Sequence, residues 1–305
     1  MKKSKKIVAG VLCLILLCAA AGCGGPASKD VADSFTLEDL ERCNAFDVVF
    51  EDYGSARIES KFYDFDLPGG DRGDFTQTSV FVKGDSGVSM YTDFSFGFAY
   101  AVEGRNVYQR DENGSYSVLA FFDDGYYEEA YLPTVSKWIL YVPTEGEELI
   151  SSSVTGGVRN LVTNTLTSDV DDYTMWGIEG IVDTNYELDA ESGLLLKVTD
   201  YLTGDDGNRR LLAEAEIRYG QDDGFTPPEY VTLCKDTTET RTVHFVRDPG
   251  TAEEKTFTFT LPKKAALHPA AMEEFELYKD PEFTVLLEEM TGEFPDEATL
   301  YMKQK

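Results

Sequence analysis

The feature that most constrains this chain is a rhythm of alternating apolar and polar residues interrupted by tight turns. Residues 186–220 read YELDAESGLLLKVTDYLTGDDGNRRLLAEAEIRYG, which predicts three strands with turns at Glu191-Ser192-Gly193 and Asp205-Asp206-Gly207. In the last of these strands Ala213, Ala215, Ile217 and Tyr219 alternate with charged residues. Connections this short predict antiparallel strands with one buried face.

The same rhythm recurs elsewhere. Ile58, Ser60 and Phe62 alternate with charged neighbours, and Asn113-Gly114 lies at the centre of an expected hairpin. Two short helices are predicted: one over 34–46, where Thr36 is the N-cap and Asp39 completes a capping box, and one over 157–166 (GVRNLVTNTL). Neither is long enough for a crossover between parallel strands. The expected fold class is mainly β (α+β), an antiparallel sheet with covering helices.

The N-terminus is a targeting segment rather than part of the fold. Lysines at 2, 3, 5 and 6 precede an apolar run over 7–21, which is too short to span a ~30 Å hydrocarbon core. Cys23 follows Ala20-Ala21-Gly22, and this arrangement resembles the bacterial lipobox, although Ala20 stands where leucine is usual. Residues 1–22 are expected to be a lipoprotein signal peptide and 23–35 a tether. An ordinary signal peptide is the alternative.

Lipidation of Cys23 would give the chain one partner, the membrane. The resemblance implies a cysteine that carries diacylglycerol, and acyl chains contribute ~0.8 kcal/mol per buried methylene. The expected location is therefore extracytoplasmic, anchored to the outer face of the bacterial cell membrane.

The charge of the chain argues against another class of partner. Its 56 acidic and 27 basic residues give a formal net charge of −29, so phosphate backbones repel it and no nucleic acid is expected to bind. The acidic residues are spread over many turns, which fits a solvated surface. Weak surface calcium binding is the alternative, but no stretch has the ligand spacing of a dedicated calcium loop.

The order of elements resembles the lipoprotein-carrier superfamily (LolA-like and LppX-like proteins). The similar features are the N-terminal helix, the acidic turns and five late segments: Leu188-Asp189, Ser192-Gly193-Leu194, Lys197, Asp206-Gly207 and 225–228. The resemblance implies a curved antiparallel half-barrel over residues 36–236, wrapped over helices. In better-known members an apolar concavity holds acyl chains, although fold similarity carries function only weakly.

One stretch, YTDFSFGFAY, carries a stripe of aromatic residues. Phe94, Phe96, Phe98 and Tyr100 are expected on one face of a single strand, with small residues on the other. This face is a candidate lining for a groove that holds a lipid or another hydrophobic ligand. The alternative is that the four rings are core residues beneath the covering helices.

Residues 240–305 resemble the internalin-type B repeat, a small β-grasp-like module of bacterial surface proteins. The residues also predict a pairing of their own, in which Phe257, Phe259 and Leu261 are buried opposite Val243 and Phe245. Two departures are Leu277 in place of Gly-Trp and Gln304 in place of an aromatic residue. The matching segments are 243–246, 256–261, 262–263, Leu267, Pro269, Tyr278, 280–283 and 300–303.

Two cysteines remain in the body of the mature chain. Cys43 and Cys234 form a possible disulfide in an oxidising exterior, and two unpaired buried thiols are the alternative. Neither has the spacing of a metal ligand.

No catalytic residue, metal ligand or cofactor site is expected, so the chain is not expected to be an enzyme. Residues 84–87 (GDSG) match the nucleophile loop of trypsin-like proteases, but the base is missing because His244 and His268 both lie in the C-terminal region. A tight turn explains these residues better. Neither histidine has a second ligand at metal spacing, and residues 154–160 (VTGGVRN) lack the lysine of a phosphate loop.

Two functions of different classes follow. One is a tethered, non-catalytic protein that binds an apolar or lipidic ligand on its curved sheet. The other is a structural or adhesive cell-surface module whose C-terminal region contacts another macromolecule.

Overall fold

The structure is a computed structural model that describes residues 31–32, 34–67, 72–84, 87–104, 106–121, 146–167, 179–204, 207–221, 224–269, 275–287 and 295–305. The expected signal peptide, Cys23 and most of the tether lie outside these ranges, as do residues 85–86 and 205–206 of two expected turns. None of the helices in the described ranges is long and apolar enough to cross a membrane.

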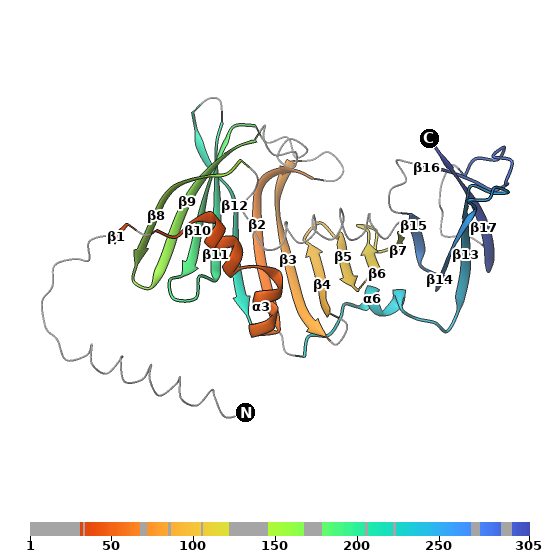
Figure 1. Ribbon diagram of the computed structural model, residues 1–305, viewed down its shortest axis with the longest axis horizontal. Helices are drawn as coiled ribbons and strands as arrows, with labels where there is room; N and C mark the ends of the chain where they lie inside the picture. Colours follow the sequence, from red (N-terminus) through yellow and green to blue (C-terminus); the bar gives the residue numbers. More distant parts are fainter. Residues whose placement is uncertain are drawn as a thin grey trace, which may run out of the picture.

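The described strands form one large open sheet and one small sheet (Figure 1). In the large sheet the chain runs outward from β2 to β7, starts again at the far side with β8, and returns strand by strand until β12 pairs with β2. The outermost strands, β1 and β15, do not pair with each other, so the curved sheet stays open. Apart from the parallel pair β7–β15, its strands are antiparallel, which is the mainly β architecture expected from the sequence. Its strands are β1 (Val31–Ala32), β2 (Ser55–Asp66), β3 (Arg72–Gly84), β4 (Gly87–Phe94), β5 (Ala99–Glu103), β6 (Asn106–Arg110), β7 (Tyr116–Ala120), β8 (Glu148–Thr155), β9 (Val158–Leu166), β10 (Ile181–Asp189), β11 (Leu195–Thr203), β12 (Arg209–Tyr219) and β15 (Ala266–Pro269).

Helices cover both faces of the large sheet. Successive residues of a strand point to opposite faces, and on β4 Met90 packs with helices α2 (Leu37–Cys43) and α3 (Phe46–Tyr53), whereas Tyr91 packs with α6 (Glu229–Cys234). We call the side covered by α2 and α3 the helix face, and the side covered by α6 the α6 face. On the helix face Leu40 and Phe50 are buried against strand residues such as Phe81, with the Phe50 and Phe81 ring centroids 5.7 Å apart.

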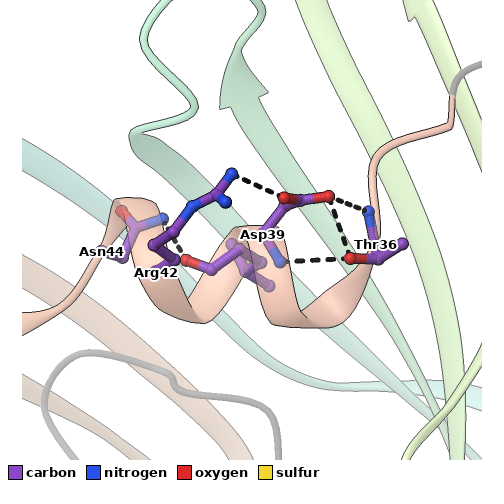
Figure 2. Close-up of polar contacts among 5 residues, drawn as sticks. Thr36, Asp39, Arg42 and Asn44 are labelled. Atoms are coloured by element: carbon purple, nitrogen blue, oxygen red, sulfur yellow. Dashed lines mark hydrogen bonds and ion pairs between the residues drawn. The ribbon is translucent and has the colours of Figure 1, made fainter.

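Helix α2 begins where the sequence predicts, at a capping box (Figure 2). The backbone N–H of Asp39 donates to Thr36 Oγ1 at 3.2 Å, and Thr36 N donates back to Asp39 Oδ2 at 3.0 Å. The expected single helix over 34–46 is wrong, because α2 ends at Cys43 and α3 begins at Phe46. Asn44 causes the break: its side chain donates to the carbonyls of Leu40 (2.9 Å) and Gly193 (3.0 Å), which ties the helix end to the β10–β11 turn.

The predicted helix over 157–166 is also wrong, since this segment is strand β9. Its residues Leu161, Thr163 and Thr165 are buried while their neighbours are less so, which is the period of a half-buried strand. Gly156 and Gly157 both have positive φ (61° and 84°), so they make a tight turn between β8 and β9. β-branched residues that alternate after a Gly-Gly pair indicate a hairpin rather than a helix.

The small sheet comprises β13 (Thr240–Arg247), β14 (Lys255–Pro262), β16 (Phe275–Tyr278) and β17 (Glu297–Gln304) in the order β14-β13-β17-β16. Its two central strands, β13 and β17, are parallel, which gives the mixed, β-grasp-like arrangement expected for this region. The predicted pairing is confirmed, because Val243 lies opposite Phe259 and Phe245 opposite Phe257. The predicted burial holds for Leu261, whereas Phe257 and Phe259 are half-buried. Val243 and Phe245 are fully buried.

The two sheets are joined by strand β15, which belongs to the C-terminal region in sequence. It leaves the small sheet and pairs in parallel with β7, at the edge of the large one, so that Leu267 lies opposite Val118. Tyr116 and Val118 of β7 then pack against the core of the small sheet, around Leu267 and Leu277. The C-terminal region therefore covers an edge that the large sheet would otherwise expose.

Candidate functional site

The four aromatic residues singled out in the sequence lie around a hairpin rather than on one strand. Strand β4 ends at Phe94 and β5 begins at Ala99, because Gly97 has a φ of 101° and Phe94 N donates to Phe98 O at 2.9 Å to close the turn. The prediction of a single strand is wrong for this reason. The rings do come together: the Phe94 centroid lies 5.1 Å from that of Phe96, 5.8 Å from that of Phe98 and 6.2 Å from that of Tyr100.

These rings continue an aromatic cluster on the sheet. Phe75 of β3 lies 6.2 Å from Phe94 and 5.5 Å from Phe96, and it stacks on Phe62 at 4.5 Å between centroids. Tyr100 lies on the helix face, in contact with the core beneath α2 and α3, and burial raises its pKa to about 12. Phe94, Phe96, Phe98 and Tyr100 are all half-buried.

A buried polar cluster on the helix face was not expected from the sequence. Thr184 of β10 donates its hydroxyl to Asp200 of β11 at 2.7 Å, and Tyr186 donates to Glu147 at 2.8 Å. Thr163 of β9 also donates to Glu147. Burial raises the pKa of Asp200 to about 7, with Glu147 as a further cause. The signal was present, because Asp200 stands between Val198 and Leu202 at a core position of an alternating strand.

A hollow lies on the opposite side of the sheet, the α6 face. It is a cavity of about 390 Å³ between strands β2–β4 and the segment that leads into α6. We call it the aromatic groove. Its lining residues are Arg57, Thr76, Thr78, Val80, Tyr91, Thr92, Asp93, Phe94, Ser95, Phe225, Pro228 and Tyr230, so it includes one of the four predicted aromatic residues.

Three aromatic side chains line the groove where α6 approaches the sheet. The rings of Tyr91 and Phe225 lie 4.9 Å apart between centroids, and both pack in one cluster with buried Tyr230. The Tyr91 hydroxyl donates to Glu103 at 2.6 Å, so a ligand in the groove would contact the ring of Tyr91 rather than its hydroxyl. The Tyr230 hydroxyl is buried and has no hydrogen-bond partner among the described residues. The register places Thr78 and Val80 of β3 beside Asp93 and Tyr91 on the same face.

Two charged side chains of opposite sign line the groove. Asp93 accepts from Arg110 Nη2 at 3.0 Å, and the Arg110 guanidinium carbon lies 5.7 Å from the Tyr230 ring centroid. Arg57 lies beside Val80, two residue pairs further along the strands than Thr78 and Asp93. The groove lining therefore offers an aromatic wall, three threonines, one serine, one carboxylate and one guanidinium. This set suits binding and orientation of an amphipathic molecule.

The two cysteines of the body are free thiols in different places. Cys43 ends α2 beside Gly193, and buried Cys234 on α6 lies 3.6 Å from the carbonyl of Ser117. The helices that carry them cover opposite faces of the sheet, so the disulfide that the sequence left open does not form. Burial raises the pKa of Cys234 to about 12.

The remaining chemistry-bearing residues do not assemble. His244 shares a hydrogen bond with Thr258 at 2.9 Å on the small sheet, and Gly84 pairs with Gly87 across a hairpin. Within the described ranges, no three His, Cys, Asp or Glu side chains are placed to hold a metal ion. Cys23, the expected lipidation site, lies outside those ranges.

Comparison with known proteins gives distant likenesses only. No family model matches the chain, and the comparison with curated proteins found no match. Among solved structures, LprF from Mycobacterium bovis matches 63% of this chain and 94% of its own, with a TM-score of 0.35 and 8% identity. MucB, solved in complex with MucA(peri), matches 74% of this chain and 75% of its own, with a TM-score of 0.26 and 14% identity. Structural overlaps with TM-scores this low do not support an inference about function.

Proposed function

We propose that this chain is a non-catalytic, extracytoplasmic binding protein, anchored to the membrane through Cys23, that holds an apolar or lipidic ligand in the aromatic groove. The observation that carries the proposal is the groove itself, a cavity of about 390 Å³ with four aromatic residues in its lining, Tyr91, Phe94, Phe225 and Tyr230. Binding sites for small molecules are typically ~300–1,000 Å³ and mostly apolar with a few polar groups, and the groove fits this description.

The groove suits a ligand better than the surface beneath α2 and α3 does. There, Leu40, Val49 and Phe50 are each at most 2% exposed and pack directly on the strands. The side chains of that region are already core. An apolar molecule would have to displace them, whereas the groove on the α6 face is already a cavity, and two of the rings that line it, Phe94 and Phe225, are half-buried.

The tether supports the anchored part of the proposal. Strand β1 pairs with the edge strand β8, with Val31 opposite Val154, so the chain leaves the sheet at a defined place. Seven residues separate Cys23 from Val31, and eight peptide steps reach at most ~30 Å. An acylated Cys23 would therefore hold the sheet close to the bilayer.

The test is binding of a fluorescent fatty acid to the secreted mature chain carrying Cys23→Ser. We expect saturable binding that Thr78→Trp reduces at least tenfold, because an indole at this half-buried position would fill the groove. Glu216→Trp is the matched control, because Glu216 of β12 lies on the same face of the sheet as Thr78 but outside the groove. Absence of saturable binding, or equal loss in the two variants, would contradict the proposal. Mass spectrometry of the protein purified from its own membrane identifies the lipid.

A second candidate is the structural or adhesive module, and one observation favours it. Val285 and Leu286 of the C-terminal region are 49% and 46% exposed, and this segment pairs with β16 at the edge of the small sheet. Adjacent exposed apolar residues suit contact with another macromolecule. Val285→Asp with Leu286→Asp should then abolish attachment of the purified protein to whole cells and leave fatty-acid binding unchanged. Unchanged attachment would reject this function.

A further inference from the structure

We infer that the aromatic groove recognises an organic ammonium group, held between the carboxylate of Asp93 and the faces of the surrounding rings. This inference rests on the proposed function, because it names the polar end of the ligand that the groove takes. The two differ in what they require: the proposed function needs only a bound apolar part, whereas this inference needs a positive charge at one position.

The carboxylate is placed for this role. Asp93 follows Tyr91 by two residues on β4, so both side chains lie on the α6 face and line the groove. Arg110 contacts one oxygen, Oδ1, and the side chain of Asp93 remains 56% exposed. Within the described ranges Oδ2 has no hydrogen bond or ion pair. Asp93 is also the only acidic residue in the groove lining.

The rings supply the second part of a cation site. The face of an aromatic ring carries negative charge density and attracts cations within about 6 Å of its centroid. Tyr91, Phe225 and Tyr230 lie together in one cluster, and all three line the groove next to Asp93. The protein already uses one of these rings in this way, since the Arg110 guanidinium carbon lies 5.7 Å from the Tyr230 centroid. Aromatic rings gathered at one site are the arrangement that recognises quaternary ammonium ligands, and Asp93 adds a negative charge to the same lining.

The same chemistry disfavours an inorganic cation. Calcium takes six to eight oxygen ligands and magnesium demands near-octahedral oxygen geometry. The groove lining provides one carboxylate, three threonines and one serine, and the hydroxyls of Thr92 and Tyr91 are engaged by Ser79 and Glu103. Hydrocarbon groups on nitrogen, by contrast, bury favourably against rings, so the groove fits an ammonium that carries carbon.

Arg57 bears on where the ammonium comes from. It lies beside Val80, whereas Asp93 lies beside Thr78, so opposite charges line different parts of the groove. A lipid headgroup carries a phosphate near its ammonium, and a guanidinium binds phosphate well. A free amine has no such group. Choline, phosphocholine and lysophosphatidylcholine share the ammonium and differ in the phosphate and the acyl chain.

The test is calorimetric titration of the secreted mature chain (Cys23→Ser) with choline and with 3,3-dimethyl-1-butanol, its uncharged isostere. We expect choline to bind at least ~10-fold more tightly, because only choline carries the charge. Equal affinity for the two would overturn the inference. Phosphocholine and lysophosphatidylcholine then identify the source: tighter binding than choline indicates a lipid headgroup, equal binding indicates a free amine, and either result supports the ammonium site.

Four variants separate charge, ring and fold. Asp93→Asn should weaken choline binding at least ~10-fold, and Phe225→Leu should weaken it although the position stays apolar. Tyr230→Phe should keep binding, because it retains the ring and removes a hydroxyl that has no partner among the described residues. Glu216→Gln, an acid on the same face outside the groove, is the charge control. If Asp93→Asn and Glu216→Gln lose the same affinity, the effect is general charge and the inference is wrong.

Failure of this inference is distinguishable from failure of the proposed function. If the parent binds the fatty acid and Thr78→Trp weakens that binding, the proposed function holds. If choline and its neutral isostere bind equally in the same protein, the ammonium site is wrong while the function stands. A chain that binds neither fatty acid nor choline removes both.

Discussion

Thr184 and Asp200 face each other on neighbouring strands of the helix face, with the threonine hydroxyl donating to the carboxyl at 2.7 Å. Among the residues that the structure describes, this is the one hydrogen bond to the carboxyl of Asp200. A buried carboxylate with one donor is poorly solvated, and burial accordingly raises its pKa from 3.8 to about 7. Glu147, which accepts from Tyr186 and Thr163, adds to the shift.

Asp200 therefore makes the stability of the protein depend on pH. Below pH 3.8 the carboxyl is protonated in both the folded and the unfolded chain and has no effect. Between pH 3.8 and about 7 only the unfolded chain ionises, so this residue lowers the free energy of unfolding as the pH rises. Asp200→Asn should thus be more stable than the parent at pH 8, by up to about 4 kcal/mol, and close to it at pH 4.

Urea unfolding of parent and variant at both pH values measures the difference. A difference that is the same at pH 4 and pH 8 would show that Asp200 ionises normally in the folded protein. Thr184→Val should act in the opposite direction at pH 8, because it removes the hydrogen bond that the ionised form accepts.

The capping box at α2 gives a second prediction (Figure 2). Thr36→Ala removes the hydroxyl that accepts from Asp39 N and should lower the free energy of unfolding by about 1 kcal/mol. Thr36→Ser keeps the hydroxyl and should stay close to the parent. Chemical denaturation of the three proteins makes the comparison, and equal stability of the Ala and Ser variants would mean that the cap contributes nothing.

Gly193 fixes how closely α2 approaches the sheet. A Cβ at this position would lie 2.7 Å from Cys43 Sγ and 3.1 Å from its Cβ, and the glycine has a φ of 76°. Gly193→Ala should destabilise the protein by about 2–3 kcal/mol through overpacking and backbone strain. Cys43→Ala in the same chain should recover part of this loss, as measured by thermal unfolding. Strictly additive effects of the two substitutions would show that the two residues do not touch.

The pairing of β15 with β7 predicts the effect of removing the C-terminal region. Deleting 240–305 would uncover the β7 edge and expose Tyr116 and Val118, which now pack on the small sheet. The remaining chain should unfold at lower temperature and associate through its open edge. Calorimetry and light scattering measure these changes. A monomer with an unchanged midpoint would show that the two regions are energetically independent.

The sequence predicted the architecture well where a single period dominates. The alternation of Ile58, Ser60 and Phe62, the turn at Gly193 and the Val243–Phe259 pairing are each local signals that tertiary contacts reinforce. It failed at 157–166, where strand pairing overrode a weak helical pattern, and at Gly97, whose positive φ turned an apparent strand into a hairpin. Local patterns decide local structure only when nothing distant competes.

The candidate site was less predictable because it joins residues that are distant in sequence. Tyr91 and Phe225 belong to different elements separated by most of the large sheet, and only the fold brings their rings within 4.9 Å. Phe94 alone among the predicted groove residues lines the aromatic groove. The buried position of Asp200, in contrast, could be predicted from the sequence, because alternation assigns it to the same strand face as Val198 and Leu202.

The most direct test of the central claim is to locate the bound ligand by nuclear magnetic resonance. With ring-labelled phenylalanine and tyrosine in the mature chain, titration with a fatty acid should shift the resonances of Tyr91, Phe225 and Tyr230 in the aromatic groove. Shifts confined to Phe98 and Tyr100, which lie outside that groove, would place the ligand elsewhere and contradict the account.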